Sequence, residues 1–156
     1  MKILKKLANK KLIQQKYEHK SAELANIKSR IFDCITSTSS IKQAYYNIEE
    51  PININTDFEE NDRIFKELLP IALEKHNELK KFYIENGSYL EKPMQSSSIL
   101  RQILHHIEKN ENQIRVLNAK HNSKDLLIAL HYLTGMKIYL NNFWKINYEN
   151  KTIILF

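Results

Sequence analysis

The sequence predicts an all-α protein, an antiparallel bundle of four main helices with one additional short helix and an extended C-terminal tail. Its 156 residues include only two glycines and three prolines, and this scarcity of turn residues fits a few long helices better than a many-stranded sheet. Hydrophobic residues make up 42% of the chain, which is enough for a globular core. The length predicts one helical-bundle domain over residues 1–156.

The first predicted helix covers the N-terminal 35 residues. Its apolar positions recur at helical spacing and share one face, with Lys20 interrupting the pattern. A second apolar patch at residues 3–8 does not line up with this face, so we expect a bend there or a segment that packs elsewhere. A short helix is predicted at residues 41–50, followed by an extended connector at residues 51–57. The aligned residues are Ile13, Tyr17, Leu24, Ile27 and Ile31.

The second long helix is predicted over residues 57–86. Asp57 is a suitable N-cap because Glu60 follows three residues later, and Gly87 is a suitable stop. Pro70 falls within the pattern, where it removes a hydrogen-bond donor and clashes with the preceding turn, so a kink or a break is expected. The apolar face reads Phe65, Leu69, Ala72, His76, Leu79 and Tyr83.

Two further helices are predicted over residues 96–120 and 123–147. A serine of the segment PMQSSS is the expected cap of the first, and Ser123 or Asn122 is the expected cap of the second. The last helix is apolar around most of its circumference, which predicts a central position in contact with several partners. Residues 152–156 have strand character, but no other strand is predicted, so we expect them to form an extended tail.

Composition limits the functional classes. Cys34 is the only cysteine, so no internal disulfide can form, and we expect a reduced compartment and a buried, unreactive thiol. No apolar run approaches the ~20 residues of a membrane span, and the N-terminus does not resemble a secretory signal, which together predict a cytoplasmic protein. The sequence contains no glycine-rich phosphate loop, Cys-x-x-Cys pair or zinc pattern, so neither a cofactor nor a metal is predicted.

Positive charge is concentrated near the N-terminus. The net charge is +6, and residues 1–30 hold nine Lys or Arg against two acidic residues, whereas residues 31–92 hold seven against twelve. This segregation fits contact with an acidic partner, contact with the acidic stretch of a second copy, nonspecific binding to nucleic acid, a membrane-surface helix, or a solvated helix face. The lysines concerned are Lys5, Lys6, Lys10, Lys11, Lys16 and Lys20.

The stretch RQILHH contains the sharpest candidate for chemistry. Arg101 and His106 are separated by four residues, and this spacing resembles the Arg-x4-6-His pair of HEPN-type ribonucleases, which are also helical bundles. The resemblance covers two residues and implies that they would be catalytic. Residues five apart lie about 140° apart around a helix, and Arg115 with His121 fits the looser spacing as well. We therefore favour a solvated helix surface for Arg101 and a flanking position for His106, and keep ribonuclease activity as an alternative.

Three polar residues interrupt the predicted apolar faces. His76 is interpreted as a core histidine hydrogen-bonded to a neighbour, because no second ligand or catalytic partner is paired with it in the pattern. Asn110 is interpreted as a polar core residue that fixes the register of two helices. Lys137 lies between Leu133 and Leu140 and is expected to extend its amine toward solvent near an end of the bundle.

These patterns predict a non-enzymatic protein-interaction module, for example a regulator, an adaptor, a secretion chaperone or an immunity-type inhibitor. The expected partner is another protein or a second copy, bound through the basic lysines or the apolar C-terminal residues. The alternatives are a nonspecific nucleic-acid-binding protein and a HEPN-like ribonuclease. The sequence identifies neither the partner nor the oligomeric state. The apolar C-terminal residues are Ile153, Ile154, Leu155 and Phe156.

Overall fold

The computed structural model describes residues 2–39, 57–90 and 98–149, and these residues form four α-helices and one 3-10 turn, with no strand among them. The predicted all-α fold is confirmed at this level. The predicted short helix at residues 41–50, the connector before Asp57 and the tail at residues 152–156 lie outside the described residues. The elements are α1 (Lys2–Ser39), α3 (Phe58–Asn86), η1 (Gly87–Tyr89), α4 (Ile99–His121) and α5 (Lys124–Glu149).

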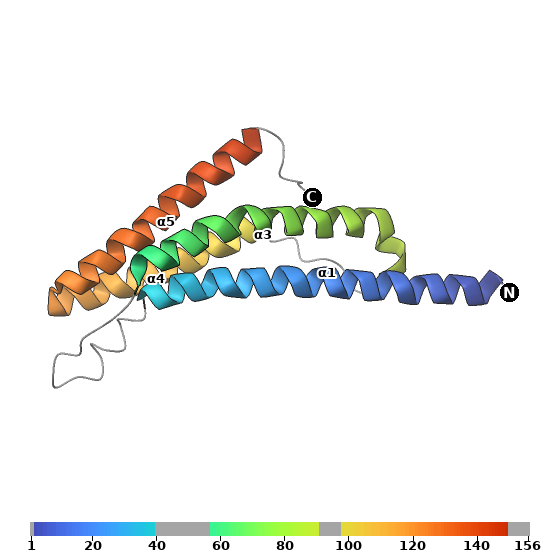
Figure 1. Cartoon of the computed structure of the whole chain (residues 1–156), viewed down its shortest axis with the longest axis horizontal. Coiled ribbons are helices and arrows are strands. Elements are labelled where there is room, and N and C mark those ends of the chain that lie inside the picture. The colour runs from blue at the N-terminus through green and yellow to red at the C-terminus, as the bar shows by residue number, and fades with distance from the viewer. Residues whose placement is uncertain (1, 40–56, 91–97, 150–156) are drawn as a thin grey trace.

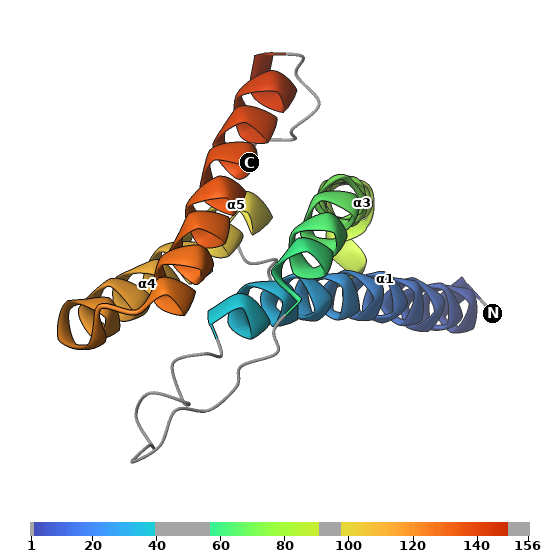
Figure 2. The same cartoon turned by 60° about the vertical axis from the view of Figure 1, so that its left-hand side comes forward.

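The helices are arranged as two adjacent pairs. Helices α1 and α3 lie side by side and run in opposite directions, and the N-terminal end of α1 extends beyond the end of α3 (Figure 1). Helices α4 and α5 form the second pair, and the C-terminal half of α5 diverges from α3 (Figure 2). Contacts of α1 with α4 and α5 join the two pairs.

Helix α3 begins and ends where its capping residues predict. The Asp57 carboxylate accepts a hydrogen bond of 3.0 Å from the backbone N–H of Glu60, and Gly87 follows the last helical residue. The helix is continuous across Pro70, so the predicted break is absent. Pro70 is exposed while Leu69 is fully buried. We attribute the continuity to this placement, because water can reach the carbonyl that lost its donor while packing holds the inner face.

The turn between α4 and α5 is closed by asparagine and serine. Asn122 adopts the left-handed conformation, with φ 45°, and its N–H donates to the Asn118 carbonyl at 2.7 Å. The Ser123 hydroxyl then accepts from the N–H of Asp125 at 3.2 Å, which makes Ser123 the cap of α5. At the start of α4, Ser98 occupies the cap position but its side chain makes no capping hydrogen bond.

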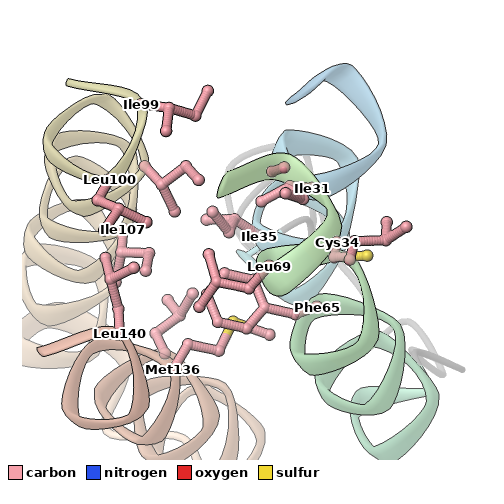
Figure 3. Packing of buried hydrophobic residues seen from close by; sticks show 14 of the residues in the cluster. Ile31, Cys34, Ile35, Phe65, Leu69, Ile99, Leu100, Ile107, Met136 and Leu140 are labelled. Atoms are coloured by element: carbon pink, nitrogen blue, oxygen red, sulfur yellow. The ribbon is translucent and has the colours of Figure 1, made fainter. Parts of the chain in front are cut away.

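The hydrophobic core lies where all four helices meet. Figure 3 shows Ile35 of α1, Phe65 of α3, Leu100 of α4 and Met136 of α5 pointing into the same space, and all four are fully buried. Among the α1 side chains that the structure describes, from Ala8 onward, the first buried one is Leu24. The N-terminal half of α1 therefore lies outside this four-helix core.

Helix α5 contacts α1, α3 and α4, as predicted. Its inner face is fully buried, but three large apolar side chains on other faces are more than 45% exposed, so α5 lies at the side of the bundle rather than at its centre. No α5 neighbour among the described residues covers those outer faces. The exposed residues are Leu127, Ile138 and Ile146.

Candidate functional site

Arg101 and His106, the residues of the ribonuclease-like pair, face different neighbouring helices. Arg101 is exposed, and its guanidinium carbon lies 6.0 Å from the ring centroid of Trp144 in α5. The His106 ring lies against α1, with its centroid 4.6 Å from that of Phe32 and its Nε2 atom 3.1 Å from the Thr36 hydroxyl. This divergence is the consequence of a five-residue separation on a helix. The two side chains are therefore not brought together around one substrate position.

The electrostatic surroundings of His106 favour its neutral form. Burial lowers its pKa, and Lys109 and His105 lower it further, while a hydrogen bond to the Phe32 backbone acts in the opposite direction. A neutral imidazole near a hydroxyl can act as a base. Here, however, its ring packs between α1 and α4, which is the arrangement of a helix contact.

His76 is buried in α3, and the structure gives it an unusual environment. Its side chain is 5% exposed, and Nε2 has no hydrogen-bond partner among the described residues. Burial is the largest of the effects that lower its pKa to about 4, followed by the positive charges of Lys80 and Lys28. The predicted core position is observed, while the hydrogen-bonded neighbour predicted for His76 is not found at Nε2. Lys80 is also buried, and burial lowers its pKa.

Glu111 is a buried carboxylate that the sequence interpretation missed. Its Oε2 atom accepts a hydrogen bond of 2.8 Å from the Thr134 hydroxyl, and Oε1 lies 3.4 Å from Lys137 Nζ. The Nη2 atom of Arg115 lies 3.7 Å from Glu111 Oε2. Lys137, which was expected to extend toward solvent, is about one-third exposed and is held by Glu111. The position four residues after Ile107 falls on the buried face of α4, and this spacing was the available signal.

Asn110 links α4 to α1, consistent with its interpretation as a register-fixing residue. Its Oδ1 atom accepts a hydrogen bond of 2.5 Å from the Ser39 hydroxyl, and its Nδ2 donates to the His106 carbonyl at 2.8 Å. Lys28 of α1 makes a second link, because its Nζ donates to Gln102 Oε1 at 2.7 Å. These buried or half-buried polar contacts serve the packing of α1 against α4.

The lysines of α1 form an accessible surface on the part of the helix outside the four-helix core. Lys10, Lys11 and Lys16 are exposed, and Lys20 is half-buried with its Nζ 5.7 Å from the Phe82 ring centroid. Leu12 lies among them and is 49% exposed. The side chains of Lys5 and Lys6 and residues 153–156 lie outside the described part of the structure.

A groove of about 670 Å³ lies between α1 and α3 beside these lysines. Lys75 crosses it toward Glu23, at 3.4 Å, and this contact lowers the pKa of Glu23 and raises that of Lys75. Lys16 and Lys20 also line the groove. Lys75 lies near both Glu23 and Glu78, so Lys16 and Lys20, which have no ion pair among the described residues, give the groove its excess of positive charge. The sequence pattern revealed the α1 lysines but not the contribution of α3.

Neither a metal-binding cluster nor a membrane-spanning helix is found among the described residues. No group of three or more His, Cys, Asp or Glu side chains in residues 2–39, 57–90 and 98–149 is placed to hold a metal ion. Among the helices described, none has both the length and the apolar content needed to cross a membrane. No protein-family model, curated protein or solved structure matches the chain.

Proposed function

We propose that the chain is an antiparallel helical bundle that binds another protein, acting as a regulator, adaptor, chaperone or inhibitor rather than as an enzyme. The contact in this proposal is the exposed surface of α1 that carries Lys10, Lys11 and Lys16. The observation that carries the proposal is that Lys10, Lys11 and Lys16 are all exposed on the N-terminal half of α1. Exposed charges of one sign, here spread around the helix, favour a partner of opposite charge and accelerate their encounter.

The divergence of Arg101 and His106 also supports a binding role over a catalytic one. Each side chain contacts a different helix of the bundle. A ribonuclease would need both groups at one phosphate, because general acid–base catalysis requires each group within hydrogen-bond reach of the reacting atoms.

The test is a comparison of two tagged proteins in cells that naturally make this chain. Nuclease-treated extracts are passed over the wild type and over the variant K10E/K11E/K16E, and retained proteins are identified by mass spectrometry. We expect specific proteins to be retained by the wild type and lost from the variant. The control is K109E/K145E, which changes exposed lysines of α4 and α5. Equal retention by all three proteins would contradict the proposed surface.

Nonspecific nucleic-acid binding is a second candidate, favoured by the same exposed lysines. Three phosphate contacts predict that affinity falls roughly 40-fold between about 50 and 200 mM salt, because each contact releases condensed counterions. Fluorescence anisotropy with a labelled duplex and a labelled single strand measures this dependence. A salt response that is flat, or unchanged by K10E/K11E/K16E, would remove this candidate.

A further inference from the structure

The outer face of α1 carries opposite charges at its two ends. Lys11 and Asp33 are both exposed, and neither takes part in an ion pair within the described part of the chain. Their positions differ by 22 residues, which is six helical turns plus about 40°, so they lie near the same line along the helix. The distance between them is roughly 33 Å. One chain cannot bring these two charges together.

Further acidic residues surround Asp33, because α3 begins beside it. Burial, Asp33 and Glu60 all raise the pKa of the Cys34 thiol, with burial the largest effect, so both carboxylates lie close to Cys34. Glu59 is exposed and has no ion pair among the described residues, whereas Glu60 is already paired with Arg63. Asp33 therefore gives the C-terminal end of the α1 face an unpaired negative charge, with the positive charge of Arg30 nearby, and Lys11 gives the other end a positive charge.

The centre of the same face is open and carries small side chains. Ala22 lies midway between Lys11 and Asp33 and is exposed, as is Ala25. A groove of about 550 Å³ lies beside them, lined in part by Tyr17 and Ser21. The face is opposite the side of α1 that contacts α3, and no described helix covers it in Figure 1. Ala22 and Ala25 leave room for a second helix at the centre of the face, and the longer exposed side chains of Gln15 and Glu18 flank the line from Lys11 to Ala22.

We propose that the outer face of α1 binds a second copy of this chain in an antiparallel pair, with Lys11 of each copy opposite Asp33 of the other. The proposal rests on the proposed function and names its partner. A two-fold axis at Ala22 places both ion pairs symmetrically and closes the assembly at two chains. Charge complementarity selects this partner, since each copy carries the basic and the acidic end in the required order.

The first experiment is analytical ultracentrifugation of the full chain at about 50 and about 500 mM NaCl, where screening differs strongly. We expect a dimer at low salt and a dissociation constant at least about tenfold weaker at high salt. K11E and D33K should each weaken the dimer by about tenfold or more, because each places like charges opposite each other twice. The double variant K11E/D33K should regain it, because the charges are exchanged while the net charge is unchanged.

K145E is the matched control for K11E, since it changes the net charge equally at an exposed lysine of α5. It should leave the dimer intact. A wild type that stays monomeric at low salt, oligomers that keep growing with concentration, or a double variant that is not rescued would each overturn the proposal. If the wild type is monomeric but still retains proteins through its α1 lysines, only this inference fails and the proposed function stands.

Oxidative cross-linking tests the register independently. A22C should form a covalent dimer rapidly because the two introduced cysteines meet at the axis. S29C should not, because the two copies of position 29 are about 21 Å apart in this register, beyond the reach of a disulfide. Both variants retain the buried Cys34. Faster cross-linking of S29C than of A22C would overturn the register.

Discussion

The buried carboxylate of Glu111 connects the two helices of the second pair. It is 4% exposed and accepts a hydrogen bond from Thr134 while lying near Lys137. Removing a buried acceptor leaves its donors without partners, and the loss exceeds the modest value of the bond itself. The Glu111 contacts therefore make this position more sensitive than an ordinary helix residue.

We expect Glu111→Ala to lower the free energy of unfolding by about 1–3 kcal/mol, measured by urea denaturation. Glu108→Ala on the same helix is the control, because Glu108 is only half-buried and has no hydrogen bond or ion pair in the described structure. Its effect should stay within about 0.5 kcal/mol. Equal losses for the two variants would show that the buried contacts do not stabilise the fold.

His76 makes the stability of the fold depend on pH. Its pKa is about 4 in the folded chain, mainly because of burial, and near 6.5 in an unfolded chain. Below about pH 6.5 the unfolded chain therefore binds a proton that folded His76 does not. The free energy of unfolding therefore keeps its full value above about pH 6.5, the pKa of histidine in the unfolded chain. It falls by roughly 3 kcal/mol as the pH drops toward the pKa of His76 in the folded chain.

His76→Leu should flatten this part of the stability profile, measured by urea denaturation at several pH values between about 7 and 4.5. Leucine removes the titrating imidazole and fills the buried position with an apolar side chain. His105→Gln is the control, since His105 is exposed. A profile of His76→Leu that runs parallel to that of the wild type would exclude His76 as the cause.

At the scale of the helices, Pro70 is a residue whose sequence signal was misleading. It lacks the N–H that an interior helical position normally donates, yet α3 continues through it. Proline in a helix interior is unfavourable by about 3 kcal/mol, partly offset because it also restricts the unfolded chain. We expect Pro70→Ala to raise the free energy of unfolding by about 1–2 kcal/mol. Glu74→Ala, at another exposed position of α3, should change it little, and an unchanged or lower stability of Pro70→Ala would contradict this.

The starts of α3 and α5 were predictable because they depend on local chemistry, whereas α1 continues to Ser39, beyond the predicted 35 residues. Asp57 caps α3, and Ser123 caps α5, by side-chain hydrogen bonds that adjacent residues determine. Continuity at Pro70 was not predictable, because it depends on packing by residues far away in the chain. The burial of Glu111 was missed for a related reason, since apolar spacing identifies buried apolar residues and gives no weight to a carboxylate whose partners lie on another helix.

The candidate surface was predictable only in part. The charge of residues 1–30 revealed the lysines of α1, but the alignment of Lys11 with Asp33 becomes meaningful only when α1 is one continuous helix. For the ribonuclease-like pair, the sequence revealed the motif but not that its two side chains point to different helices. Its spacing could be recognised in the sequence, while the separate contacts of Arg101 and His106 required the positions of α1 and α5.

At the scale of the whole molecule, the shared core predicts cooperative unfolding of the two helix pairs. Phe65 is fully buried where the four helices meet, and Phe65→Ala should lower the free energy of unfolding by about 3–5 kcal/mol. Trp144 is the only tryptophan, so its fluorescence follows α5, whereas circular dichroism follows all helices. We expect both signals to shift together in denaturant. Separate transitions would show that the pairs unfold independently and contradict the single domain.

The chemical reactivity of Cys34, the only cysteine of the chain, reports local opening of the helices around it. Cys34 is 6% exposed, and burial raises its pKa, so an alkylating reagent reaches a reactive thiolate only after the surrounding helices separate. The rate at which Cys34 is alkylated therefore measures how often these helices separate, and no probe has to be introduced. Because Asp33 is the adjacent residue, the same rate measured over a range of protein concentrations would reveal whether association of two copies slows the opening of each.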